Sequence, residues 1–182
     1  DLLMFGSFDE KQAAQKITDE ACVCKCGCST DSGLAKLPQV RAAQEFEVLR
    51  LATEKSAKRP KAFMLTIGNL AMRLARAQFS CNFLACAGYE VIDNLGFDTV
   101  EAGVASAQKA GADIIVLCSS DDEYAEFAPA AFKAIDGKQI FIVAGAPACM
   151  EDLKAQGIEN FIHVRSNVLE TLKSFNAQLL KK

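Results

Sequence analysis

Residues 61–182 alternate regularly between short apolar runs and longer segments that carry helix signals. The five apolar runs have the hydrophobic character of strands that are covered on both faces. Most of the segments between them begin at a capping residue or end at a glycine, as helices do. Strands separated by helices pair in parallel through right-handed connections. The sequence therefore predicts an α/β fold, flavodoxin-like and Rossmann-like, with a five-stranded parallel sheet in the order 2-1-3-4-5 and helices on both faces.

The bounds of the expected elements follow from these runs and signals. Strands are predicted at 62–67, 89–93, 113–118, 139–144 and 160–164. Helices are predicted at 70–87, 98–110, 120–135 and 149–156, and from 166 to the end of the chain. Ser120 and Ser166 are the expected N-caps of the third and the last of these helices.

The N-terminal part of the chain has a different character. Residues 1–60 lack strand patterns and are predicted to form a helical arm, with helices at about 7–21 and 41–58, joined to a single α/β domain at 61–182. A length of 182 residues accommodates one such domain and a smaller element, but not two full domains.

A cluster of cysteines, Cys22, Cys24, Cys26 and Cys28, occupies every second position of this arm. In an extended strand the four thiols would line one face at spacings of about 7 Å. Three interpretations stay open: a zinc ion or iron–sulfur cluster, redox chemistry of the thiols, or no specific role.

Charge and hydropathy exclude several classes of partner. The formal net charge of −3 gives no basic surface for nucleic acid. No apolar run approaches the roughly 18 residues that span a membrane, and no secretory signal is visible. The other cysteines lie in apolar stretches and are predicted to be inert buried thiols of a reducing compartment, so we expect a cytoplasmic protein. These are Cys81, Cys86, Cys118 and Cys149.

Three small residues follow the strands whose carboxyl ends form the ligand-binding edge of such a sheet. Gly68, Ser119 and Gly145 come after the first, third and fourth predicted strands, where small side chains allow a planar ligand to approach closely. They are therefore the candidate cofactor-binding residues. The alternative is that Ser119 only leads into a helix and that Gly145 only precedes a turn. Neither a G-x-G-x-x-G nor a P-loop pattern is present, so a dinucleotide or P-loop site is not supported.

The remaining polar residues near the strand ends predict neither a catalytic nor a metal site. His163, the single histidine, falls in the fifth predicted strand with no second histidine to share a metal. Asp121 and Asp122 are expected to favour a helix N-terminus through its dipole. Glu123, together with Glu126, has the pattern of a solvated helix face.

Several stretches of the chain carry a family resemblance. They are Leu65-Thr66-Ile67-Gly68, Ala87-Gly88-Tyr89-Glu90-Val91, Val116-Leu117-Cys118-Ser119-Ser120-Asp121 and Phe161-Ile162-His163. Through them, residues 41–180 resemble the C-terminal cobalamin-binding domain of methylmalonyl-CoA mutase, and specifically that of its small subunit. The resemblance is spread over many positions rather than concentrated in one motif.

The resemblance also shows where this chain departs from the family pattern. The family's catalytic subunit carries D-x-H-x-x-G after the first strand, and its His binds cobalt. Here that loop reads Gly68-Asn69-Leu70-Ala71-Met72-Arg73, without the Asp, the His or the final Gly. The family's Ser-x-Leu reads Ser119-Ser120-Asp121, and its Gly-Gly reads Gly145-Ala146. The resemblance therefore implies that Gly68, Ser119 and Gly145 are vestigial cofactor-binding residues and that no cofactor is expected on this chain.

By the same resemblance, the chain would be the C-terminal part of a longer, non-catalytic small subunit. It would support the catalytic large subunit in a heterodimer, an isomerase that interconverts methylmalonyl-CoA and succinyl-CoA with adenosylcobalamin. Two alternatives remain open. One is a functional cobalamin-binding module without a histidine cobalt ligand, and the other is a flavodoxin-like domain with a metal- or redox-active cysteine arm.

Overall fold

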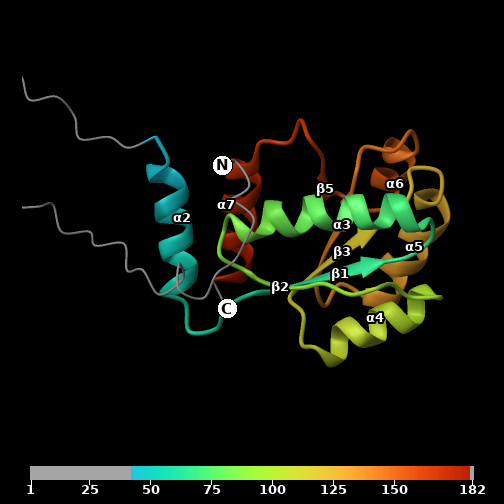
Figure 1. The fold of residues 1–182 in the computed structure, drawn as a ribbon, viewed down its shortest axis with the longest axis horizontal. Coiled ribbons are helices and arrows are strands. Elements are labelled where there is room, and N and C mark those ends of the chain that lie inside the picture. The colour runs from blue at the N-terminus through green and yellow to red at the C-terminus, as the bar shows by residue number, and fades with distance from the viewer. Residues whose placement is uncertain (1–41, 181–182) are drawn as a thin grey trace, which may run out of the picture.

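The computed structural model describes residues 42–180 and shows a five-stranded sheet flanked by helices (Figure 1). All the strand pairs are parallel, and the order is β2-β1-β3-β4-β5, as predicted. The strands are β1 (Lys61–Thr66), β2 (Glu90–Ile92), β3 (Ile114–Cys118), β4 (Ile140–Ala144) and β5 (Phe161–Ile162). The helices are α2 (Gln44–Glu54), α3 (Leu70–Ala85), α4 (Val100–Lys109), α5 (Tyr124–Ile135), α6 (Met150–Ala155) and α7 (Val168–Leu179).

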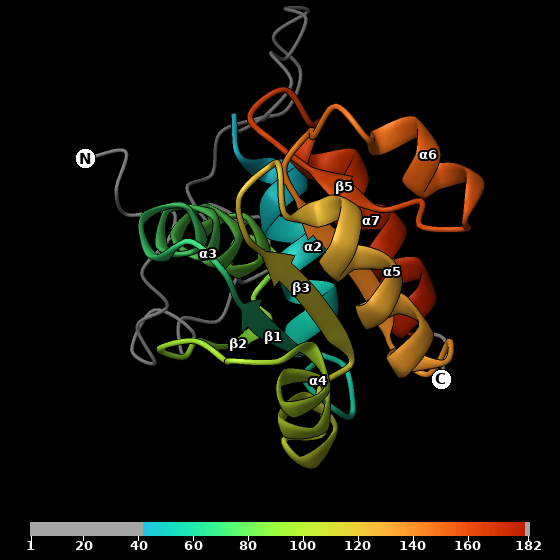
Figure 2. The same ribbon diagram turned by 90° about the vertical axis from the view of Figure 1, so that its right-hand side faces the viewer.

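Alternation along the central strands divides the core into two layers. In β1, Phe63 and Leu65 face a cluster with residues of α4, α5 and α6, whereas Ala62 and Met64 face a cluster with residues of α2, α3 and α7. Figure 2 looks onto the carboxyl edge of the sheet, with α3 on one side and α4 and α5 on the other. Because β1, β3 and β4 are covered on both faces, their central residues are apolar without alternation.

The structure corrects the prediction of the fifth strand. β5 contains only Phe161 and Ile162, so His163 lies beyond the strand rather than inside it. The backbone turns there because the N–H of His163 donates to Ser166 Oγ at 3.0 Å and Nδ1 of His163 accepts from the N–H of Arg165 at 3.2 Å. These local hydrogen bonds replace the strand ladder that the apolar pattern predicted.

Both predicted N-caps are also corrected. Helix α7 is capped by Asn167, whose side chain accepts from the N–H of Glu170, because the Ser166 hydroxyl is already bonded to His163. Helix α5 begins at Tyr124, after a turn at 121–123, so Ser120 is not its N-cap. The helix predicted at 98–110 begins two positions later, at Val100, with Thr99 as its N-cap accepting from the N–H of Ala102.

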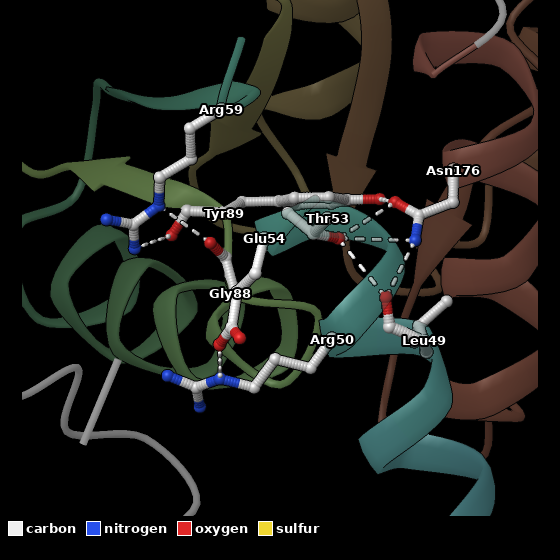
Figure 3. A network of polar contacts seen from close by, with 8 residues as sticks. All are labelled: Leu49, Arg50, Thr53, Glu54, Arg59, Gly88, Tyr89 and Asn176. Atoms are coloured by element: carbon white, nitrogen blue, oxygen red, sulfur yellow. Dashed lines mark hydrogen bonds and ion pairs between the residues drawn. The ribbon is translucent and has the colours of Figure 1, made fainter. Parts of the chain in front are cut away.

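Helix α2 is attached to the α/β layers by a buried polar network (Figure 3). Asn176 of α7 accepts from the Tyr89 hydroxyl at 2.7 Å and donates to the carbonyl of Leu49 at 3.3 Å. Its side chain also lies against the hydroxyl of Thr53. Leu49, Tyr89 and Asn176 are all buried, so the network joins α2, α7 and the residue before β2 inside the fold.

No helix among the described residues is long and apolar enough to cross a membrane.

Candidate functional site

The three predicted residues lie at the carboxyl edge of neighbouring strands. Gly68 follows β1, Ser119 follows β3 and Gly145 follows β4, and these three strands are paired side by side. Both glycines have positive φ values, +79° for Gly68 and +151° for Gly145, which explains why glycine occupies these turns. The structure therefore brings the three positions to one edge, where a ligand of this fold would bind.

A carboxylate lies between the first two of these positions. Oε2 of Glu123 accepts from the hydroxyls of Ser119 at 2.6 Å and Ser120 at 2.7 Å. It also accepts from the backbone N–H groups of Ser120 and Asn69, each at 3.2 Å. One side chain thus connects the loop after β3 to the loop after β1. The prediction that Glu123 belongs to a solvated helix face is wrong, because its oxygen is held by four donors.

This set of donors sets the charge of Glu123. Hydrogen bonds from Ser119 and Ser120 to the charged form hold the pKa of the carboxyl down, from an ordinary value of 4.5 to about 2. A fixed negative charge therefore occupies the ligand-binding edge at neutral pH.

The carboxylate fills the space that the glycine after β1 would offer to a ligand. A Cβ atom placed on Gly68 would lie 2.2 Å from Oε2 of Glu123. A ligand atom placed at the position of that Cβ would therefore collide with the carboxylate, which already lies against the backbone of Gly68.

The glycine after β4 is covered in a similar way. A Cβ atom on Gly145 would lie 3.2 Å from Oδ1 of Asp121 and 3.3 Å from Cζ of Arg76. Arg76 and Asp121 form an ion pair at 2.9 Å across the carboxyl edge. Asp121 therefore pairs with a cation from α3, a contact that the sequence did not predict.

Tyr124 closes the space between β3 and β4. Its hydroxyl donates to the carbonyl of Ala144 at 2.5 Å and accepts from the N–H of Ser119 at 3.1 Å. The whole side chain is buried. The Tyr124 side chain thus bridges the ends of β3 and β4, and it occupies the space through which a ligand group would have to pass between them.

Together these contacts do not fit a bound cobalamin. By the family resemblance given above, its nucleotide tail would need the spaces beside Gly68, Ser119 and Gly145. Glu123, Asp121, Arg76 and Tyr124 lie in these spaces. A ligand there would also have to displace a charged carboxylate from four hydrogen bonds, which is costly.

The other predicted residues take no part in the hydrogen bonds of Glu123. His163 follows β5 at the same edge of the sheet, and its hydrogen bonds given above are made within its own loop. Cys81, Cys86, Cys118 and Cys149 are free thiols, and Cys118 is fully buried while the others are partly buried. Burial raises the pKa of the Cys81 thiol to about 12 and also raises that of Cys118, which keeps both protonated and unreactive.

Metal binding finds no support within residues 42–180, where no group of three or more His, Cys, Asp or Glu side chains could hold an ion. The cluster Cys22, Cys24, Cys26 and Cys28 lies outside the described residues. A cavity of about 680 Å³ opens at the opposite, amino-terminal edge of the sheet, where Lys58, Gln139 and Asn160 are among its lining residues. It is therefore separate from the carboxyl edge.

Sequence reasoning missed the residues that fill the edge: Asn69, Arg76, Glu123 and Tyr124. The signal for Glu123 was present, because Ser120 and Glu123 have capping-box spacing and Glu123 does accept from the N–H of Ser120. Its reach to Asn69, which is 54 positions away along the chain, has no local signature.

No family model matches the chain. Among curated proteins, it is 66% identical over 149 residues to the methylmalonyl-CoA mutase small subunit of Porphyromonas gingivalis, a match that covers 82% of this chain and 24% of that subunit. It is 38% identical over 104 residues to the small subunit of Streptomyces virginiae, covering 54% of this chain and 17% of that protein. The resemblance read from the sequence is thereby confirmed, and the chain spans about a quarter or less of the length of the relatives it matches.

Among solved structures, a cobalamin-binding protein from Desulfitobacterium hafniense is similar, with a TM-score of 0.47 and 21% identity. The match covers 77% of this chain and 72% of that one.

Proposed function

We propose that this chain, whose sequence is similar to a region of methylmalonyl-CoA mutase small subunits, is a non-catalytic domain that supports a catalytic large subunit in a heterodimer. The complete enzyme would interconvert methylmalonyl-CoA and succinyl-CoA with adenosylcobalamin on the large subunit. This chain would bind no cobalamin itself, and it would work in the cytoplasm. Its contribution would be to assembly and stability rather than to chemistry.

The observation that carries this proposal is the position of Glu123. Its carboxylate touches the backbone at Gly68, in the loop where the family's catalytic subunit places its cobalt ligand. The 66% identity to a named small subunit supports the proposed assembly. The position of Glu123 and the identity to a small subunit together favour a domain that has kept the fold of a cobalamin-binding domain, with its own side chains in the place of the ligand.

Two measurements test the proposal. The small subunit that contains this sequence, co-expressed with the large subunit, should purify with it at a fixed ratio. The small subunit alone, titrated with cobalamin, should give no absorbance change, whereas the large subunit should give a stoichiometric change under the same conditions. Stoichiometric uptake by the small subunit would contradict the non-binding part, and failure to purify together would contradict the heterodimer.

The alternative of a cobalamin module without a histidine ligand makes a different prediction. Ser119 and Gly145 are present at the family positions, so removal of the filling side chains should then improve binding. The Glu123→Ala variant should bind more tightly than the wild type if the edge is still a working site. Equal absence of binding in both favours the supporting role.

A further inference from the structure

The cavity at the amino-terminal edge of the sheet has no role in the proposed function. Its volume of about 680 Å³ lies within the range of pockets that hold small molecules. Its walls come from the loops before β1, β3, β4 and β5 and from the C-terminal parts of α5 and α7. Because the Glu123 contacts lie at the opposite edge of the sheet, the two regions are independent. We call this one the amino-edge cavity.

One polar atom of the cavity wall lacks a hydrogen bond. Oε1 of Gln139 is buried and accepts from no donor within residues 42–180. A buried acceptor without a partner is unfavourable, and an N–H group of a ligand beside it would remove that cost. The terminal torsion of a glutamine side chain is soft, so the amide can turn this oxygen towards a group inside the cavity. Gln139 therefore offers the cavity a contact for a hydrogen-bond donor.

The wall around Gln139 is held in place by hydrogen bonds. The N–H of Ile140 donates to the carbonyl of Asp113 at 3.0 Å. On the next strand, Nδ2 of Asn160 donates to the carbonyl of Phe141 at 3.1 Å. A wall that is already fixed loses little entropy when a ligand binds, which favours binding of a small molecule.

The rest of the wall suits a flat, uncharged body. Phe132 is partly exposed and presents an aromatic ring on which a planar group can stack. Gly137 leaves open space, since a Cβ atom there would meet nothing within 4 Å. The formal charges of the lining cancel, because its charged residues are two lysines and two acids: Lys58, Lys138, Asp113 and Glu159. Lys58 and Asp113 also pair with each other at 2.8 Å, so the cavity favours a neutral planar group over an ion.

We propose that the amino-edge cavity binds the adenine group of a nucleotide or coenzyme, with the exocyclic amine of the base donating to Oε1 of Gln139. A glutamine amide matches adenine at two adjacent atoms, since its oxygen accepts from the amine and its N–H donates to a ring nitrogen. The ring of Phe132 supplies the stacking surface that a base needs. This inference goes beyond the proposed function and does not depend on it.

Titration of the full chain with adenosine, followed by the amide signals in nuclear magnetic resonance spectra, tests the proposal. Signals of 137–140 and 157–160 should shift and saturate, with a Kd below about 1 mM. Purine riboside, which lacks the exocyclic amine, should bind about ten-fold more weakly, the factor expected for one hydrogen bond to a buried acceptor.

Variants connect this preference to one side chain. In Gln139→Met the two nucleosides should bind alike, because the acceptor for the amine is gone. Gln78→Met is the matched control, since Gln78 is exposed on α3 and donates only to Asn82, and it should keep the ten-fold preference. Unchanged β3 signals verify that each variant is folded.

Free nucleotides and coenzyme A share the adenine group, so AMP and coenzyme A are added as competitors to the adenosine-bound chain. Displacement by AMP alone assigns a free nucleotide, displacement by coenzyme A alone assigns a CoA compound, and displacement by both assigns the shared base. Each of these results supports the proposal, whereas displacement by neither overturns it. It is also overturned if adenosine does not saturate the shifts, if purine riboside binds as tightly, or if the shifts fall around Gly68 and Ser119 instead. Failure of the proposed function would show separately, as absence of a complex with the large subunit.

Discussion

At the scale of single residues, Glu123 is the side chain that connects two loops of the carboxyl edge. Its carboxylate accepts four hydrogen bonds and joins the loops after β1 and β3. In a ligand-binding relative of this fold, backbone and hydroxyl donors at the same edge would be directed at a bound group. Here these donors bond instead to the carboxylate of Glu123, which is charged at neutral pH.

The pH dependence of stability should reflect this carboxylate. Because the folded-state pKa of Glu123 is about 2, below its ordinary 4.5, the group stabilises the fold fully above pH 4.5. That contribution is lost as the pH falls from about 4.5 towards 2. The Glu123→Gln variant should therefore be less stable than the wild type at pH 7, and the gap in Tm should narrow as the pH falls through this window. Thermal unfolding at a series of pH values measures the gap, and a gap that is constant from pH 7 to pH 3 would contradict the assignment.

The contact between Glu123 and Gly68 can be tested by a double-mutant cycle. Gly68→Ala places a methyl group 2.2 Å from the carboxylate at a φ of +79°, so we expect it to cost about 2–3 kcal/mol of the free energy of unfolding. In a Glu123→Ala background the collision is gone and only the backbone strain remains, about 1 kcal/mol. Denaturant unfolding of the four proteins gives the coupling energy. Additive effects would show that the carboxylate does not occupy the space beside Gly68.

At the scale of elements, the sequence predicted the five strands, their order and the helices between them, because each signal is local. The apolar runs in β1, β3 and β4 are long enough to identify by composition alone. The prediction failed where a long-range or competing contact decides the outcome. β5 ends after two residues because Ser166 bonds to His163, and Asn167 becomes the cap for the same reason. The role of Glu123 was predicted wrongly because one of its hydrogen-bond donors, the N–H of Asn69, lies far away in the sequence.

The packing of α2 on α7 also has no local signature, and it depends on one buried amide. Asn176→Ala removes the partner of the buried Tyr89 hydroxyl. It also removes one donor from the Leu49 carbonyl, which still accepts from the Thr53 hydroxyl at 3.3 Å. Leaving the Tyr89 hydroxyl unsatisfied should cost about 1–3 kcal/mol of the free energy of unfolding.

Denaturant unfolding measures this loss. Asn82→Ala is a matched control, because the side chain of Asn82 only accepts an exposed hydrogen bond from Gln78, and we expect it to change stability by less than about 0.5 kcal/mol. Equal effects of the two substitutions would mean that the network in Figure 3 does not hold α2 in place.

At the scale of the whole molecule, the extent of the folding unit follows from that helix. The sequence predicted a domain at 61–182 preceded by an arm, and this boundary remains a prediction. The structure favours an earlier start, because Leu49 of α2 packs in the same cluster as Leu172 and Phe175 of α7. The arm segment nearest to the domain thus contributes to the core that lies on one face of the sheet.

Two truncated chains decide between the two boundaries. Residues 42–182 should unfold at a Tm close to that of the full chain. Residues 61–182 should unfold about 10 °C lower, since the loss of Leu49 burial and of the Asn176 bonds removes about 2–3 kcal/mol from a domain of this size. The shorter chain should also bind a hydrophobic dye, because Leu172 and Phe175 lose their cover. Within the longer chain, Leu49→Ala should reproduce most of the loss, whereas Val48→Ala, at a position that is 59% exposed, should not. Equal Tm values for the two truncated chains would place the boundary at residue 60 instead.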